Sequence, residues 1–446
     1  MLPGRNNLIM PDRRILLADC DQFFVAVARL ADPEGAGKAR LLIVGGTRES
    51  RGVVCSASYE ARRFGVRSAM PIARALRLCP DAVCVPVPRK ACIEKSRAVA
   101  SVLRRFSPVV EPASVDELYL DLTNTERLYR EEPLDKTSAR IREAVRAETD
   151  LSVSIGGGTS KLVAKLATEF AKPRPGTSAT GVYIVPPGEE AAFVSRLSLA
   201  ELPGVGPRFQ ERLAEHGWRQ VADVLPLDQA TLTRNLGERA GEWLYQRIRG
   251  IDPSPVHERD RVKSVSREET FPRDLNEDAA LERELVRLVD RGAADMRESG
   301  LAARTITVKL RDYDRTTRQA SRTLRAPVIA DRAILTLAHE LLARLRADRR
   351  VPARLIGVSL SQFADVAQLD LLDVSDAEVE VDRDRRLARA VDAVRERFGR
   401  TALTPGVLAV SAASERKRTP DAPADGRAGR RPGPDGTASR PRRREY

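Results

Sequence analysis

The sequence is poor in aromatic residues, paired cysteines and long apolar runs, and each shortage excludes a class of protein. Aromatic residues make up 4% of the 446 residues, too few for a stacking platform that binds single-stranded nucleic acid. The five cysteines all lie in the first hundred residues and include no CxxC pair, which argues against disulfides and zinc sites. No apolar run approaches the ~18 residues of a membrane span, so we expect a cytoplasmic chain without membrane contact.

Basic residues, in contrast, are in excess. The formal net charge of +13 indicates a polyanionic partner, and without a membrane segment nucleic acid is the leading choice. Part of the excess lies in a tail rich in Pro, Gly and Arg from about residue 414, which we expect to be disordered. Together with the low aromatic content, the charge favours binding through phosphates.

Two acidic motifs stand at the ends of predicted strands. Asp116 and Glu117 follow a predicted turn and precede an alternating strand, and an apolar strand near the N-terminus runs into Asp19 and Asp21. Carboxylates from two segments suit Mg²⁺, and a pair of such ions can clamp the attacking and leaving oxygens of an in-line displacement. Either motif alone is as well explained by a solvated strand end, but together they favour a metal site.

Side chains suited to phosphate recur further along the chain. Tyr59 and Arg62 fall on one face of a predicted helix, where a phenol and a guanidinium can hold a triphosphate. Lys161, Lys165 and Lys172 share one stripe if the helix after the glycine triplet persists to the next proline. Each group alone is more often a solvated helix face, but beside an acidic site both suit phosphates.

The order of predicted elements indicates an α+β multidomain protein. Strands separated by two helical crossovers fit a ferredoxin-like domain through residue 180, in which the strand 151–155 ends before the glycine triplet. A helical segment follows, and the glycines of its Leu202–Gly206 turn expose N–H groups that can hold a phosphate. After a Pro-rich linker, 262–363 repeats the βαββαβ order, with arginines on its middle strands that suit a duplex backbone.

Five motifs, in this order, resemble those of the Y-family translesion DNA polymerases, closest to the bacterial DNA polymerase IV type. They are ADCDQFF at 18–24, ASYEARRFGVRSAMP at 57–71, SVDELYLD at 114–121, GGGTSKLVAKLATEFAKP at 156–173 and LPGVG at 202–206. The resemblance implies a right-hand polymerase fold. Its expected parts are an N-terminal extension (1–13), a ferredoxin-like palm (14–21 and 89–180), small fingers (22–88), a helix-hairpin-helix thumb (186–250), a linker (251–261), a βαββαβ little finger (262–363), an acidic linker with a clamp-binding peptide and an amphipathic helix (364–413), and a disordered basic tail (414–446).

The resemblance also implies roles for individual residues. Asp19, Asp116 and Glu117 match the catalytic, metal-binding carboxylates, with the Cys20 carbonyl as a further ligand of two Mg²⁺ ions, whereas Asp21 is not expected to bind metal. Residues matching contacts to the incoming nucleotide are Phe23, Phe24, Ser56, Tyr59, Arg62 and Lys172, with Phe24 as the steric gate against ribose. Expected DNA contacts are Lys161, Lys165, Gly204, Gly206, Arg267 and Arg322.

The activity implied is template-directed DNA synthesis of low fidelity past lesions, by nucleotidyl transfer from a dNTP to a primer 3′-OH. The expected partners of a monomeric chain are primer–template DNA, dNTP and the β sliding clamp. The expected clamp-binding residues are Gln368, Leu369, Leu371 and Leu372, whose leucines could instead fold back on the little finger. Two rival functions stay open, a non-catalytic polymerase-like DNA-damage adaptor and a palm-type nucleotidyl cyclase.

Overall fold

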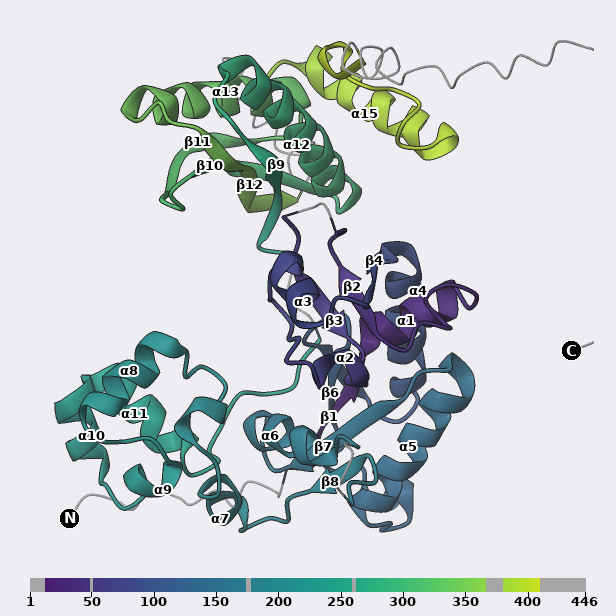
Figure 1. The fold of residues 1–446 in the computed structure, drawn as a ribbon, viewed down its shortest axis with the longest axis vertical. Coiled ribbons are helices and arrows are strands. Elements are labelled where there is room, and N and C mark those ends of the chain that lie inside the picture. The colour runs from purple at the N-terminus through teal and green to yellow at the C-terminus, as the bar shows by residue number, and fades with distance from the viewer. Residues whose placement is uncertain (1–12, 49–50, 174–177, 259–261, 366–379, 410–446) are drawn as a thin grey trace, which may run out of the picture. The chain divides into compact units, whose positions relative to one another are not determined.

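A computed structural model describes the chain at residues 13–48, 51–173, 178–258, 262–365 and 380–409. The chain divides into two compact units, Met1–Val262 and Lys263–Tyr446 (Figure 1). Within the described ranges, no helix is long and apolar enough to cross a membrane. The predicted clamp-binding peptide lies outside the described residues.

A five-stranded sheet in the first unit has the ferredoxin-like arrangement predicted from the sequence. Its strands, in spatial order, are β5 (Val109–Pro112), β6 (Glu117–Asp121), β1 (Ile15–Cys20), β7 (Val153–Gly158) and β8 (Val182–Ile184). The first four are antiparallel and β8 runs parallel to β7. Two helices, α4 (Arg89–Leu103) and α5 (Leu134–Thr149), cover one face, and α6 (Lys161–Ala171) covers the other.

Alternation along β1 puts Asp19 on the face of this sheet that α6 covers. The even-numbered residues of β1 pack with α4 and α5, whereas Ile15 and Leu17 pack against Ala164 of α6. Asp19 continues the odd-numbered set, and Glu117 lies directly opposite it in the register of β6. Two carboxylates from distant parts of the sequence therefore face α6 side by side.

The glycine triplet belongs to β7, so the prediction that the strand ends at residue 155 was wrong. The strand runs to Gly158 and is buried throughout. A Cβ atom at Gly156 would lie 2.1 Å from the amide nitrogen of Thr168 and 2.3 Å from the carbonyl oxygen of Ala164, both in α6. The strand continues through glycine because only glycine lets α6 approach this closely.

Helix α6 ends at Ala171, short of the proline that the predicted lysine stripe required. Lys172 has extended backbone angles (φ −62°, ψ 117°) because a residue before proline avoids the helical region. The prediction of one helical stripe is therefore wrong for Lys172. Lys161, Lys165 and Lys172 nevertheless all pair with carboxylates of the sheet that α6 covers.

A three-stranded sheet forms within the segment predicted as an insertion. Its spatial order is β3 (Val54–Ala57), β2 (Leu42–Gly45) and β4 (Val83–Pro86), with β2 and β4 parallel. Helix α1 (Phe23–Ala31) packs on one side, and α2 (Tyr59–Arg62) and α3 (Ile72–Leu78) pack on the other. Phe23 and Val27 of α1 also enter the core of the five-stranded sheet. Helix α1 therefore joins the two sheets.

The rest of the first unit is helical. Its elements are α7 (Glu190–Val194), η2 (Leu199–Glu201), α8 (Pro207–Glu215), α9 (Val221–Val224), α10 (Gln229–Leu236) and α11 (Glu238–Arg247), and a short η1 (Glu126–Tyr129) precedes α5. In the predicted turn Gly204 has φ +100° and Gly206 is the N-cap of α8. Beyond α11, Val256 is buried with Ile15 of β1, so part of the predicted linker packs on the palm-like sheet.

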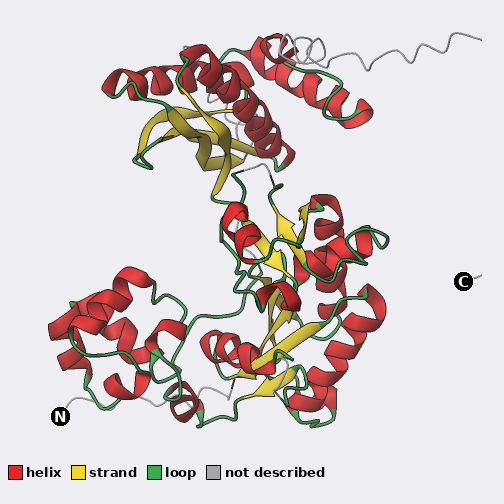
Figure 2. Ribbon diagram, viewed as in Figure 1, coloured by secondary structure: helices red, strands yellow, loops and turns green. Residues whose placement is uncertain are grey.

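The second unit contains a four-stranded antiparallel sheet (Figure 2). Its spatial order is β11 (Thr317–Val328), β10 (Leu301–Asp312), β12 (Ala353–Asp365) and β9 (Ser264–Leu275). Helices α12 (Asp278–Glu298) and α13 (Asp331–Asp348) cover one face. The predicted βαββαβ chain order is confirmed. The two sheets differ in strand order, because β9, the first strand of this sheet, lies at its edge, whereas β1 lies in the centre of the five-stranded sheet.

The predicted amphipathic helix is α15 (Asp382–Phe398), with Gly399 as its C-cap. Two of its large apolar side chains, Leu387 and Phe398, are 60% and 66% exposed. The buried positions are Ala388 and Arg395, and the Arg395 guanidinium lies 2.8 Å from the Asp290 carboxylate of α12. The helix is therefore attached largely through ion pairs.

We expect Gly156→Ala to lower the free energy of unfolding by roughly 3 kcal/mol, since the added methyl group forces β7 and α6 apart. Urea denaturation measures this loss. Gly206→Ala is a matched control, because Gly206 has an ordinary φ of −79° and a Cβ there meets nothing within 4 Å. Equal stability of the two variants would contradict the close approach of β7 and α6.

Candidate active site

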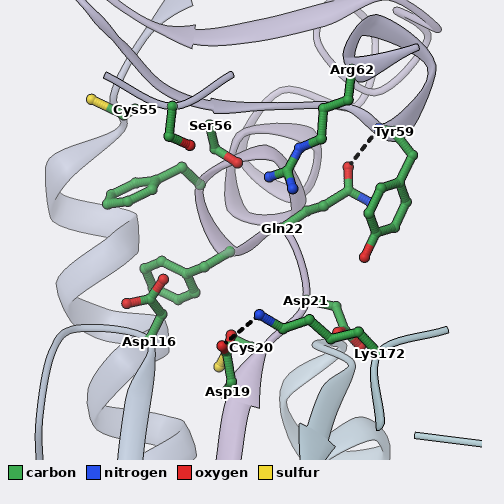
Figure 3. A pocket seen from close by; sticks show the side chains of 13 residues that line it. Asp19, Cys20, Asp21, Gln22, Cys55, Ser56, Tyr59, Arg62, Asp116 and Lys172 are labelled. Carbon is green, nitrogen blue, oxygen red and sulfur yellow. Dashed lines mark hydrogen bonds and ion pairs between the residues drawn. The ribbon is translucent and has the colours of Figure 1, made fainter. Parts of the chain in front are cut away.

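The predicted metal-binding and nucleotide-binding residues, except Glu117, line a single pocket (Figure 3). The lining residues are Asp19, Cys20, Asp21, Gln22, Phe23, Phe24, Cys55, Ser56, Tyr59, Arg62, Ser68, Asp116 and Lys172. They come from the end of β1, the start of α1, the β3–α2 segment, the loop between α2 and α3, the turn before β6 and the residue after α6. The pocket therefore gathers side chains that are far apart in the sequence.

The turn before β6 is built around Ser114. Its hydroxyl oxygen accepts hydrogen bonds from the backbone N–H groups of Asp116 and Glu117 at 3.2 and 3.0 Å, and it donates to the Asp116 carboxylate. The N–H group of Cys20 donates to the carbonyl oxygen of Asp116 at 2.9 Å. These bonds hold the second acidic motif against the end of β1, which carries the first.

Lysines neutralise two of the three predicted catalytic carboxylates. The Lys172 ammonium lies 2.8 Å from an Asp19 carboxylate oxygen, and the Lys165 ammonium lies 2.7 and 2.6 Å from the two oxygens of Glu117. Glu117 accordingly does not line the pocket. Among the described residues, no three acidic, histidine or cysteine side chains are already arranged around one point as metal ligands, because the lysines hold two of the carboxylates.

The two lysines do not fully offset the cost of burying the negative charge of the acidic cluster. Asp19 is 9% exposed, and burial together with repulsion from Glu117 and Asp116 raises its pKa to about 6 although Lys172 opposes the rise. Burial lowers the pKa of Lys172, but Asp19 and Glu169 more than offset this effect and the net shift is upward. A proton, an ammonium or a metal cation is therefore stabilised beside Asp19.

The donor set fits a hard divalent cation. Carboxylate oxygens of Asp19, Asp116 and Glu117 and the backbone carbonyl of Cys20 are the ligand types that Mg²⁺ prefers. The Cys20 thiol does not contribute, because it packs in the core and burial raises its pKa well above the ordinary value. The Lys172 ammonium already occupies a place beside Asp19 where positive charge is needed.

Helix α2 presents the predicted phosphate-binding groups. The Arg62 Nε–H donates to the carbonyl oxygen of Ala57 at 2.9 Å, and its guanidinium lies 5.6 Å from the centre of the Tyr59 ring. The terminal nitrogens of Arg62 point into the pocket, as Figure 3 shows. Ser56, on the adjacent strand β3, is 5% exposed. This part of the pocket offers donors to an anion on the side away from the carboxylates.

The two aromatic residues of α1 differ in environment. Phe23 is 2% exposed and belongs to the core, whereas Phe24 is half-buried, and their ring centres are 5.4 Å apart in an edge-to-face contact. Phe24 therefore presents the more accessible ring to the pocket, and Phe23 supports it from below.

Four lining residues were not predicted as site residues, namely Asp21, Gln22, Cys55 and Ser68. The Asp21 carboxylate accepts hydrogen bonds from the hydroxyl groups of Ser152 and Ser154 at 2.8 and 2.7 Å, so it fastens the end of β1 to β7, in line with its expected absence from the ligand set. Gln22 could have been suspected from its place between the acids and the aromatics of one motif, whereas nothing local marks the other two.

Most of the predicted DNA contacts are engaged within the protein. The Lys161 ammonium lies 2.6 Å from the Glu111 carboxylate, and Lys165 pairs in the same way with Glu117. In the second unit Arg267 pairs with Asp295 of α12, and Arg322 lies 2.7 Å from Glu340 of α13. Gly204 and Gly206 lie in the turn between η2 and α8, as predicted. Their roles toward DNA stay predictions.

Three family models match most of the chain. The impB/mucB/samB family matches residues 18–169, its C-terminal domain matches 262–371, and the DNA polymerase-iota thumb domain matches 200–252. These three ranges contain all three predicted catalytic carboxylates, the glycine turn and the four-stranded sheet.

Curated relatives match over nearly their whole length. The chain is 36% identical to DNA polymerase IV of Desulfatibacillum aliphaticivorans over 411 residues, 92% of this chain and 100% of that protein. It is 40% identical to DNA polymerase IV of Halorhodospira halophila over 351 residues, 78% of this chain and 95% of that protein. Among solved structures, the Y-family DNA polymerase chimera Dbh-Dpo4(243-245)-Dbh has a TM-score of 0.69 and 24% identity, covering 79% of this chain and 99% of that chain. That likeness supports the fold.

The raised pKa of Asp19 predicts a pH dependence of stability. Because the folded pKa of about 6 exceeds the ordinary value of 3.8, the stability that this carboxyl group contributes is fully present below pH 3.8 and is lost as the pH rises through 6. Asp19→Asn stays neutral and should remove this part of the dependence. In buffer with a chelator, the variant should gain on the order of 2 kcal/mol relative to the wild type between pH 4 and pH 7.5. A constant difference across that range would contradict the burial of a charged Asp19.

Proposed function

We propose that this chain, which belongs to the Y-family of DNA polymerases and is a DNA-directed DNA polymerase, performs low-fidelity translesion synthesis by two-metal-ion nucleotidyl transfer. The observation that supports the mechanism best is the facing pair Asp19 and Glu117, with Asp116 tied to the same strand end. Two Mg²⁺ ions bound at such a cluster would lower the pKa of the primer 3′-OH and neutralise charge on the triphosphate.

The chain's own residues bind and orient the reactants. Asp19, Asp116 and Glu117, with the Cys20 carbonyl, would hold the ions, and Arg62 and Tyr59 would bind the triphosphate from α2. Such a site does little covalent work, so positioning and electrostatic stabilisation account for most of the rate.

Lys165 and Lys172 take part by exchanging partners. Each ammonium neutralises a carboxylate in the structure. Bound cations would take over that charge, and Lys172, whose ammonium lies 2.8 Å from the Asp19 carboxylate, would then be able to contact the triphosphate. The lysine thereby stabilises charge on the departing pyrophosphate.

Phe24 selects the sugar. Its half-buried ring is braced by the buried Phe23, so it cannot retreat readily into the core. A braced ring beneath the sugar leaves no room for a ribose 2′-OH.

The open face of the four-stranded sheet is the better candidate for DNA contact than the two predicted arginines. Arg267 and Arg322 pair with residues of α12 and α13, which places them on the helix-covered side. The alternate residues form two rows of hydroxyl groups across all four strands. The rows are Ser264, Ser361, Thr305, Thr323 and Ser266, Ser359, Thr307, Ser321.

Hydroxyl groups donate hydrogen bonds to phosphate oxygens without reading sequence. Thr305 and Thr323 already share a hydrogen bond at 2.9 Å, which orders one end of the first row. A flat face of short donors therefore suits a duplex backbone, whatever base pair or lesion it carries.

The rival functions have less support. A non-catalytic adaptor has no need of three carboxylates, and its retention of lysine-paired acids at strand ends goes unexplained. A nucleotidyl cyclase has no use for the hairpin at Gly204 or the hydroxyl face. Clamp binding by 368–372 and a monomeric state rest on the sequence alone and stay predictions.

We expect Asp116→Ala to abolish nucleotide incorporation, with a loss of about a thousandfold or more in single-turnover primer extension, because the ions lose a shared ligand. Binding to primer–template, measured by fluorescence anisotropy, should change little. Asp135→Ala, an exposed acid in the first turn of α5, is the matched control and should behave as wild type. Incorporation by Asp116→Ala within tenfold of wild type would refute the metal assignment.

We expect Thr307→Glu to weaken the affinity for primer–template roughly tenfold at low salt, since a carboxylate replaces a donor in the middle of the hydroxyl face. Thr336→Glu makes the same change at an exposed position of α13, on the helix-covered side, and should bind DNA like wild type. Equal loss of affinity in both variants would mean that the change in net charge weakens binding, and it would contradict DNA contact by this face.

A further inference from the structure

Gln22 connects the metal-binding strand to the steric gate through a backbone conformation that L residues seldom adopt. Its φ of 49° and ψ of 42° are left-handed, a conformation that is unfavourable for residues other than glycine. The turn is held at both ends, because the Ala26 N–H donates to the Gln22 carbonyl oxygen at 2.9 Å and the Asp21 N–H donates to the Ser152 carbonyl oxygen at 2.9 Å.

The Gln22 side chain reaches α2 on the other side of the pocket. The Tyr59 N–H donates to the Gln22 Oε1 at 3.1 Å, the bond drawn in Figure 3. Tyr59 is the first residue of α2, and N–H groups at a helix start have no partner within the helix. Ser58 caps the same helix by accepting from the Ala61 N–H at 3.3 Å. Gln22 therefore completes, from a distant segment, the cap that Ser58 begins.

We propose that Gln22 is a positioning residue that sets the distance between the catalytic carboxylates and the phosphate-binding groups of α2. It lies three residues after Asp19 in the sequence and one hydrogen bond from Tyr59. This inference rests on the proposed function, since it takes Tyr59 and Arg62 as triphosphate contacts.

Two links make the turn a rigid connector. On one side the Asp21 carboxylate is bound by Ser152 and Ser154 of the β7 region, and on the other the Gln22 amide is bound to α2. Without the amide, α2 keeps its Ser58 cap and its packing on the three-stranded sheet but loses its hydrogen bond to the segment that follows the metal-binding strand. The Arg62 guanidinium would then no longer be held at a fixed distance from the catalytic carboxylates. This change should weaken nucleotide binding more than it slows the chemical step.

The test compares substitutions that remove the acceptor in different ways. Gln22→Met keeps the length of the side chain without an acceptor, and Gln22→Gly also removes the acceptor but adopts the left-handed backbone more readily. In steady-state primer extension both should raise the KM for dNTP about three- to tenfold, with a smaller fall in kcat. The inhibition constant of pyrophosphate should rise by a similar factor, since it uses the same contacts. Gln229→Met, at an exposed position of α10, should match wild type.

The outcomes separate positioning from a structural role. A wild-type KM in Gln22→Gly would mean that the backbone conformation and not the amide matters, and it would overturn the inference even if Gln22→Met folded poorly. A wild-type KM in Gln22→Met would overturn it equally. Failure of the wild-type chain to incorporate nucleotides would instead refute the proposed function.

Discussion

Repulsion among carboxylates on one face of the palm sheet is the constraint on which the site depends. Asp19 and Glu117 lie opposite each other on the neighbouring strands β1 and β6. The Asp116 carbonyl oxygen accepts a hydrogen bond from the last residue of β1. In the structure the ammonium groups of Lys165 and Lys172 balance two of these charges, yet the pKa of Asp19 is still raised to about 6. The site therefore favours additional positive charge, which fits the proposed binding of metal ions.

The fold meets this constraint by bringing α6 very close to the sheet. Gly156 lets the backbone of α6 lie directly on β7, so its lysines reach the carboxylates of β1 and β6. Pro173 ends the helix at the point where Lys172 must turn toward Asp19. Helix α1 then joins the carboxylates to the three-stranded sheet, on which α2 carries the groups proposed to bind the triphosphate. The catalytic arrangement thus follows from two packing contacts and one turn.

Periodicity was enough to predict the ferredoxin-like sheet and the second βαββαβ unit, because alternation and turn residues are local signals. Most of the pocket residues were instead named from the family resemblance that the order of the motifs carries. Which acidic side chain each basic side chain pairs with was not predictable from the sequence. Lys161 and Arg322 look like DNA contacts in the sequence, but their acidic partners Glu111 and Glu340 are distant and become neighbours only through tertiary packing. The same holds for α15, where the buried Arg395 pairs with Asp290, 105 residues away, while Leu387 and Phe398 stay exposed.

In the proposed mechanism the carboxylates exchange lysines for two divalent cations when substrates bind. The most direct measurement counts Mn²⁺ bound to the complex of the chain with primer–template and a non-hydrolysable dNTP, by electron paramagnetic resonance. We expect two ions per chain in this complex and a loss of tight Mn²⁺ binding on Asp116→Ala. Binding of one ion or none by a wild-type chain that extends primers would contradict the two-ion mechanism.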